Sequence, residues 1–208
     1  MFDSKRLLDQ LVNSGFAGGL AGGAAGAAVM NALSGKKAKK YAGTALKAGG
    51  LALIGGLAYK AWQHHKKDAV PAQDAPPPAA FVPETPEDSS VLNMLLIRSM
   101  IAAARADGSI DSTEHQAIMS RIGELQLDDA EKAYLFEQFA APVDVYALAK
   151  DADTEAHAAE MYAASALIVS SPSPEEQQYL NTLAAALRLP TGLQEEIHRA
   201  IESQPTAA

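Results

Sequence analysis

The sequence predicts an all-α protein in which a C-terminal bundle of seven helices follows a glycine-rich first third. After residue 88, apolar residues recur at helical spacing, and no stretch alternates apolar and polar residues as a half-buried strand does. Residues suited to begin a helix occur at regular intervals in the same region. The first 68 residues differ from this pattern, because they hold twelve of the 15 glycines. The chain therefore has two unlike parts.

Charge and proline content divide the chain into residues 1–68, 69–88 and 89–208. Residues 1–68 carry ten basic and three acidic side chains, whereas residues 69–208 carry seven basic and 22 acidic ones. The net charges of these two parts are therefore +7 and −15. Residues 69–88 hold six of the 11 prolines, a composition typical of an extended, semi-stiff tether. We therefore expect a basic segment joined by a linker to an acidic helical domain.

The basic segment has features of a membrane anchor. Residues 11–35 include no charged side chain, and a membrane-spanning helix needs about 20 apolar residues. A second apolar run at 48–59 is too short to span unless it extends over 41–62. Lysines between and after the runs favour the cytoplasmic side or an anionic lipid surface. Membrane insertion or close association is expected, and a soluble segment that self-associates is the alternative.

Glycines recur at every fourth residue of the first run, which would let two helices pack closely and form a homo-oligomer. They form two sets, Gly15, Gly19, Gly23 and Gly18, Gly22, Gly26.

Several classes of function are not expected. The chain has no cysteine, so it has no disulfide, thiolate zinc site or thiol redox centre. Its histidines lack the H-E-x-x-H spacing of a zinc site, and its glycine-rich stretch lacks the G-K-[ST] ending of a phosphate loop. No nucleophile is paired with a base in sequence, so no enzymatic activity is expected. The lysines have no interleaved aromatic residues, so nucleic-acid binding is not expected either.

Helices are predicted from residue 89 onward, with several residues expected to begin them. The expected helices are 89–106, 112–125, 128–139, 142–151, 154–170, 174–188 and 191–202. Asp128, Thr154, Ser173 and Thr191 are expected as N-caps, and Pro142 and Pro174 in first turns. The expected core residues are Met94, Leu95, Ile97, Met100, Ile101, Ile118, Ile122, Leu125, Leu180, Leu183 and Leu187.

An acidic turn, A-R-A-D-G-S-I-D-S-T-E at residues 104–114, partly matches a calcium-binding EF-hand loop. Its acids Asp107, Asp111 and Glu114 fall on loop positions five, nine and twelve. Positions one and three fall on Ala103 and Arg105, so half of the expected ligands are missing. Three carboxylates could still hold a weakly bound, partly hydrated Ca²⁺ or Mg²⁺. The alternative is a purely structural corner, in which the acids cap the following helix.

The turn also belongs to an internal pseudo-repeat. A shift of 62 residues places Glu114 on Glu176 and Ala102-Ala103-Ala104 on Ala164-Ser165-Ala166. In the second copy, Val169 and Ser173 stand where the first copy has its two aspartates. Glu176 is thus the acid expected to help the first turn bind an ion.

The string M-I-A-A-A-R-A-D-G-S-I-D-S-T-E, with a second repeat that ends in L-A-A-A-L-R-L, resembles the TerB-like domain of tellurite-resistance proteins. The whole arrangement resembles the membrane-anchored bacterial branch of inner-membrane proteins known as domain of unknown function family 533. This resemblance implies a seven-helix TerB-like fold, a bacterial inner-membrane location and a metal-binding acidic face at Asp107, Asp111 and Glu114. It implies no established enzymatic activity and no certain cofactor.

Two functions remain open from the sequence. The first is a membrane-tethered, non-enzymatic module whose acidic domain, on the cytoplasmic side, binds a protein partner and a divalent cation. The second is a structural scaffold that self-associates through its glycine helices and has no metal role.

Overall fold

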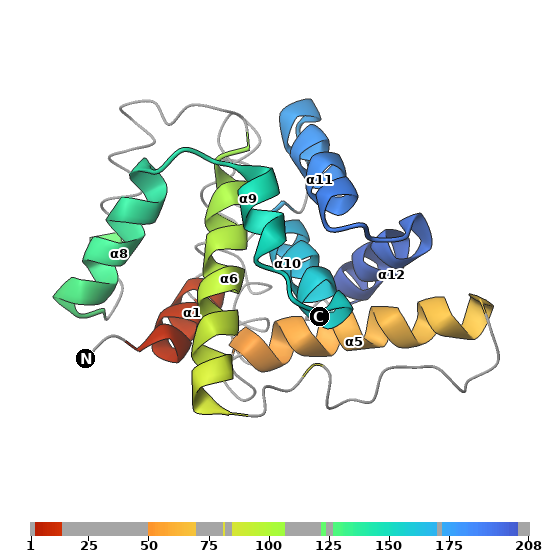
Figure 1. Ribbon diagram of the computed structural model, residues 1–208, viewed down its shortest axis with the longest axis horizontal. Helices are drawn as coiled ribbons and strands as arrows, with labels where there is room; N and C mark the ends of the chain where they lie inside the picture. Colours follow the sequence, from red (N-terminus) through yellow and green to blue (C-terminus); the bar gives the residue numbers. More distant parts are fainter. Residues whose placement is uncertain are drawn as a thin grey trace, which may run out of the picture.

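Figure 1 shows the computed structural model, which describes residues 3–13, 50–69, 81, 85–106, 122–123, 127–169 and 172–203. The helices are α1 (Ser4–Asn13), α5 (Gly50–Ala69), α6 (Pro86–Ala104), α8 (Asp129–Ala140), α9 (Val145–Lys150), α10 (Glu155–Ile168), α11 (Pro174–Ala186) and α12 (Thr191–Glu202). No strand occurs in these ranges, which confirms the all-α class. Most of the expected helix 112–125 lies outside them.

Helix α10 forms the centre of the structure and contacts α5, α6, α11 and α12. Small residues on several sides of α10 are fully or almost fully buried, among them Ala159, Ala163 and Ala164 at 0% exposure. A helix that is buried on all sides belongs to the interior of a protein. Polar side chains also join it to its neighbours: Tyr162 Oη lies 3.0 Å from His198 Nε2 on α12, and Ser165 Oγ donates to the Ser99 carbonyl on α6.

Helices α1 and α5 belong to the same hydrophobic core as the C-terminal helices. Helix α5 contacts α1, α10 and α12, and α1 also contacts α6 (Figure 1). Leu7, Leu8, Leu11 and Ile54 are completely buried. Ile54, Leu57 and Ala58, in the described part of the run 48–59, thus pack against protein, although the sequence suggested a membrane segment.

The helix starts follow local side-chain chemistry in most cases. Asp128 and Ser173 form capping boxes with Glu131 and Glu176, and Thr154 caps α10, so three of the four predicted N-caps are confirmed. The prediction for Thr191 was wrong, because Pro190 occupies the N-cap position and Thr191 is the first helical residue.

Two other boundary predictions also need correction. Pro142 is not in a first turn, because α9 begins at Val145 and is capped by the side chain of Asp144. Helix α6 begins at Pro86 rather than 89, because Thr85 accepts a hydrogen bond from the backbone N–H of Asp88. Pro174 does stand in the first turn of α11, as predicted.

The predicted core residues that the structure describes are buried, except for Met94, which is half-buried.

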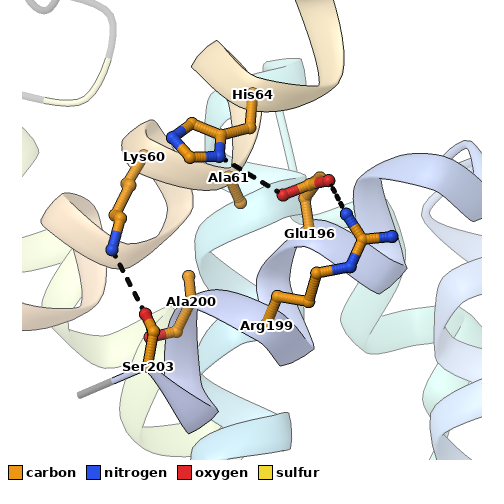
Figure 2. Close-up of a pocket in the computed structure, with 7 residues that line it drawn as sticks. All are labelled: Lys60, Ala61, His64, Glu196, Arg199, Ala200 and Ser203. Carbon is orange, nitrogen blue, oxygen red and sulfur yellow. Dashed lines mark hydrogen bonds and ion pairs between the residues drawn. The ribbon is translucent and has the colours of Figure 1, made fainter. Parts of the chain in front are cut away.

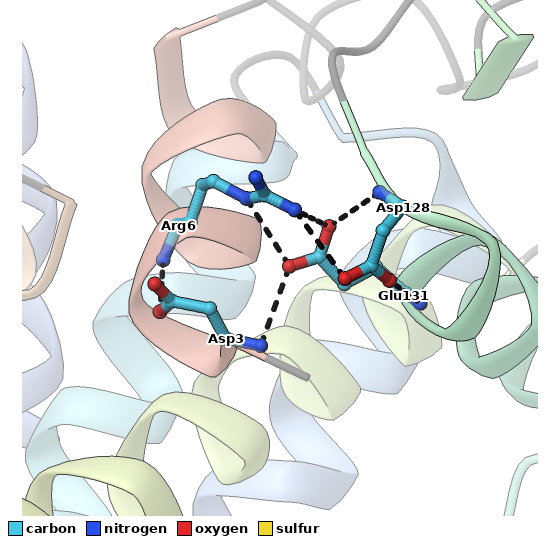
Figure 3. Close-up of polar contacts among 4 residues, drawn as sticks. All are labelled: Asp3, Arg6, Asp128 and Glu131. Atoms are coloured by element: carbon cyan, nitrogen blue, oxygen red, sulfur yellow. Dashed lines mark hydrogen bonds and ion pairs between the residues drawn. The ribbon is translucent and has the colours of Figure 1, made fainter. Parts of the chain in front are cut away.

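A charged cluster fastens α1 to the start of α8, as Figure 3 shows. Glu131 is fully buried, and its carboxylate accepts hydrogen bonds from the Arg6 side chain at 3.2 and 2.5 Å. It also accepts from the backbone N–H of Asp128 at 2.8 Å and of Asp3 at 3.3 Å. A buried carboxylate needs such partners, because removing it from water is costly. The hydrogen bond to Glu131 raises the pKa of Arg6.

A second carboxylate sets the start of α5. Asp9 Oδ1 accepts a hydrogen bond from the Gly50 backbone N–H at 2.6 Å, so α1 supplies the N-terminal cap of α5. The two helices also pack closely at Gly50, since a Cβ there would lie 3.1 Å from Val12 Cγ2 and 3.2 Å from the Leu8 carbonyl oxygen.

Among the residues that the structure describes, no helix combines the length and apolar character needed to cross a membrane. The charge-free run at 11–35 lies outside this part from residue 14 onward, so its expected membrane role stays a prediction. The predicted linker also lies largely outside it, although Phe81 is buried against the core.

Removing the Leu8 side chain tests whether α1 contributes to the core. We expect Leu8→Ala to lower the free energy of unfolding by about 2–5 kcal/mol, because it leaves a cavity at a fully buried site. Val91→Ala, at a side chain 58% exposed, is the control and should change it by less than about 0.5 kcal/mol. Urea unfolding of the full chain, followed by circular dichroism, measures both. Equal small effects would show that α1 is not part of the folded core.

Candidate functional site

The start of α11, which belongs to the second copy of the pseudo-repeat, faces the end of α6 across a pocket of about 770 Å³. We call it the α6–α11 pocket. Its lining residues are Arg105, Ala106, Pro142, Val143, Val145, Pro174, Glu175, Gln178, Tyr179 and Thr182. Ala106 directly precedes Asp107, and Glu175 directly precedes Glu176. The pocket therefore brings the beginning of the acidic turn, at Arg105 and Ala106, to the start of α11.

The predicted ligand residues can be placed only in part. Asp107, Asp111 and Glu114 lie outside the described residues. Glu176 is 7% exposed and completes the capping box of α11, where its Oε2 accepts a hydrogen bond from the Ser173 N–H at 2.7 Å. Its structural role is thus established, and a share in ion binding stays a prediction. In the described ranges, no three His, Asp or Glu side chains are grouped as metal ligands.

Arg105 forms one wall of the α6–α11 pocket and is held there by its neighbours. Its Nη1 donates a hydrogen bond to the Ala141 carbonyl, which ties the end of α6 to the connection between α8 and α9. Burial lowers the pKa of this guanidinium. Tyr179, on another wall, has its hydroxyl within 3.3 Å of Ser165 Oγ, and burial raises its pKa. Both side chains are therefore fixed by packing.

A second pocket, of about 450 Å³, lies between α5 and α12, and Figure 2 shows it. We call it the α5–α12 pocket. Lys60 and His64 are one helical turn apart on α5, and Glu196, Arg199 and Ser203 follow one another along α12. Residues three and four apart lie on the same face of a helix, so each helix presents its polar groups to the other.

The charged groups of the α5–α12 pocket are paired with each other. Glu196 is 7% exposed, and its carboxylate lies between the Arg199 guanidinium and His64 Nδ1, the latter 3.6 Å away. Lys60 Nζ donates to Ser203 Oγ at 3.2 Å, and Ser203 Oγ donates to the Ala200 carbonyl. These interactions join the first third of the chain to the last helix. The sequence did not predict them, although the Lys60 and His64 spacing could have indicated a polar helix face.

Glu160 is a buried acid that sequence reasoning also missed. It lies in α10 with 0% exposure, and neither carboxylate oxygen has a hydrogen-bond partner among the described residues. Gly55 allows α5 to approach it, because a Cβ there would lie 3.0 Å from Glu160 Oε1. Burial disfavours the charged form and raises the pKa of Glu160 to about 8. The side chain is therefore a neutral acid in the core at neutral pH.

The described geometry defines a class of protein: an all-helical body whose polar pockets lie where helices distant in sequence meet. Residues 17–201 match the family described as "Protein of unknown function (DUF533)", and the chain belongs to that family. It is also similar to a protein of Yersinia enterocolitica described as "Uncharacterized protein in ampR 5'region". The two are 25% identical over 109 residues, which cover 52% of this chain and 78% of the relative. No solved structure matches the chain.

Glu160 should make stability depend on pH. Its pKa is raised from 4.5 to about 8 in the folded state, so the folded protein retains a proton that the unfolded chain loses in this window. The stabilisation is complete below about pH 4.5 and is lost as pH rises to 8. The free energy of unfolding of the wild type should decline by roughly 3.5 kcal/mol between pH 5 and 8, and Glu160→Gln, which is neutral throughout, should remove this decline.

Urea unfolding across this pH range measures the effect. Glu155→Gln, at an exposed acid of the same helix, is the control and should keep the wild-type slope. A Glu160→Gln variant whose stability follows pH as the wild type does would show that Glu160 is not a buried neutral acid.

Proposed function

We propose that this chain is a membrane-tethered, non-enzymatic module with a TerB-like bundle, which binds a protein partner beside a divalent-cation site at the acidic turn. The main support is a group of exposed apolar side chains. Four large hydrophobic side chains are exposed in the described residues, and three of them, Phe136, Val143 and Tyr146, lie within eleven positions. Exposed apolar residues that are close in sequence on two successive helices are candidates for a protein interaction site.

The charge around these side chains indicates the chemistry of the partner. Residues 128–155, which include α8 and α9, carry eight acidic and two basic side chains. Tyr146 is 65% exposed and can contribute both apolar area and a hydroxyl to an interface. The segment that carries Phe136, Val143 and Tyr146, which we call the α8–α9 corner, therefore suits a partner that presents basic side chains around an apolar residue.

The cation site would adjoin this surface. Val143 belongs to the α8–α9 corner and also lines the α6–α11 pocket with Ala106 and Glu175. A cation held by Asp107, Asp111 and Glu114, with Glu176 nearby, would thus lie at the edge of the partner surface. Carboxylate ligands favour Ca²⁺ or Mg²⁺. Such an ion would reduce repulsion between the acids and help to fix the turn.

The tether is supported by the sequence of the first third. The charge-free run at 11–35 and the lysines that follow it suit an anionic membrane surface. We place the protein at the bacterial inner membrane with the bundle in the cytoplasm, in keeping with the rule that basic flanks stay on that side.

A photo-crosslinking amino acid at position 146 tests the partner surface. We expect it to give a discrete protein adduct in cells, and the same replacement at Val91, which is exposed on α6, to give none. Glu137→Lys, which reverses a charge on the exposed side of α8, should weaken the adduct at 146. Equal adducts at 91 and 146, or none at 146, would contradict a specific partner surface at the α8–α9 corner.

Titration of the purified full chain with Ca²⁺ or Mg²⁺ tests the cation site. Millimolar metal should raise the melting temperature of the wild type, because an ion that binds the folded state stabilises it. Glu176→Gln should weaken this rise while keeping the fold, since glutamine also suits the third position of a capping box. Asp107→Asn with Asp111→Asn should abolish it. A wild type that shows no shift with either metal would remove the cation from the proposal.

A further inference from the structure

The α5–α12 pocket has the size and the charge pattern of a binding site for a small molecule. Its volume of about 450 Å³ lies within the range of roughly 300–1,000 Å³ that is typical of ligand pockets. Ala61 on α5 and Ala200 on α12 are buried between the two helices, and their short side chains leave this space unfilled. Longer polar side chains surround it. The pocket therefore has both room for a ligand and groups that can recognise one.

Lys60 brings to the pocket a positive charge that has no acidic partner among the described residues. Its Nζ donates a hydrogen bond to Ser203 Oγ at 3.2 Å, and Ser203 in turn donates to the Ala200 carbonyl. Ser203 is neutral, so this contact leaves the charge of Lys60 without compensation. An ammonium group has three protons to donate. Lys60 can therefore also bind an anionic group in the pocket.

Glu196 brings negative charge to the same pocket. Its partner Arg199 is shared with Glu195, whose Oε2 lies 3.3 Å from Arg199 Nη2, so one positive charge faces two negative ones. Glu196 is 7% exposed, and its Oε2 lies 3.6 Å from His64 Nδ1, which is longer than a hydrogen bond. In the described part of the chain this oxygen accepts no hydrogen bond, so it can accept one from an amine.

Figure 2 shows the Lys60–Ser203 pair on one side of the pocket and the Glu196 carboxylate on the other, with Ala61 and Ala200 between them. We propose that the α5–α12 pocket binds a small zwitterion, an amino acid whose carboxylate meets Lys60 and whose ammonium group meets Glu196. The short carbon chain between the two charged groups then lies over the alanines. Such a ligand is matched in charge at both ends, because one carboxylate faces Lys60 and one ammonium group faces the surplus negative charge beside Glu196.

The ligand would bridge two helices that are far apart in sequence. Because it contacts both α5 and α12 only when they are packed together, binding should stabilise the folded state and raise the melting temperature. The α5–α12 pocket shares no lining residue with the α6–α11 pocket, and it contains no residue of the α8–α9 corner. The site therefore does not depend on the partner or the cation of the proposed function.

A series of ω-amino acids tests the class of ligand and the separation of its charges. Glycine, β-alanine, γ-aminobutyrate and ε-aminocaproate carry the same two charges on chains of increasing length, whereas butyrate and butylamine carry one charge each. Each is titrated into the purified full chain by calorimetry. We expect one amino acid to bind at least about tenfold more tightly than both single-charge controls, since it makes one more hydrogen bond to a charged group. Equal affinity for butyrate or butylamine, or no binding of any amino acid at millimolar concentration, would overturn the proposal.

Two substitutions locate the bound ligand. Lys60→Met removes the ammonium group from an exposed side chain, and Glu196→Gln removes the charge from the opposite side of the pocket. Each should weaken binding of the tightest amino acid by roughly tenfold or more, because each removes a charged partner. Lys150→Met and Glu155→Gln, at exposed positions outside the pocket, are the matched controls and should bind as the wild type does.

Lys60→Met decides the outcome even if Glu196→Gln does not fold. Lys60 is exposed, and its replacement leaves the ion pair between Glu196 and Arg199 in place. Circular dichroism shows whether each variant is folded. A folded Lys60→Met variant that binds the amino acid as tightly as the wild type would place the ligand elsewhere and contradict the proposed site.

Discussion

The close packing of α10 is the constraint on which the rest of the structure depends. Its alanines let neighbouring helices approach closely, and dispersion contacts at such short range add up over the whole helix. Helices α5, α6, α11 and α12 cover it, and α1 completes the body by packing on α5 and α6. A helix with no solvent-facing stripe has to be enclosed, so helices distant in sequence are brought together around it. Both pockets lie where these enclosing helices meet.

The polar side chains inside this packing are satisfied in different ways. Ser99 and Ser165 bond to backbone carbonyls, and Glu131 collects an arginine and two backbone N–H groups. Glu160 has no such partners among the described residues, and it avoids the cost of a buried charge by retaining its proton. Among the buried acids of the described residues, Glu131, Glu176 and Glu196 each accept a hydrogen bond, whereas the Glu160 carboxyl has no such partner.

The sequence predicted those features that depend on neighbouring residues. The caps Asp128, Thr154 and Ser173 act on backbone groups three positions away, so the local pattern was sufficient. Thr191 and Pro142 were misassigned because Pro190 and Asp144 take the boundary positions beside them. The DUF533 family was also predicted correctly, from a string of residues and the order of the segments.

Features that depend on long-range contacts could not be predicted in the same way. The apolar run that begins α5 has the composition of a membrane segment, and only its contacts with α10 and α12 show that it packs inside the protein. The α5–α12 pocket and the unpartnered Glu160 depend on the same packing. The candidate acids of the first turn were found from their spacing alone. The structure adds that Ala106, beside them, shares a pocket with Glu175.

The junction between Asp9 and Gly50 also has a consequence for the cost of folding. The chain has 36 residues between Asn13 and Gly50, and its two ends must be brought together for Asp9 to cap α5. Closure entropy grows with the logarithm of loop length, so replacing this interval by about four residues would favour the folded state by roughly 2 kcal/mol. The helical body therefore carries this interval at a modest entropic cost. A change in the length of the interval would alter the free energy of folding by only a small amount.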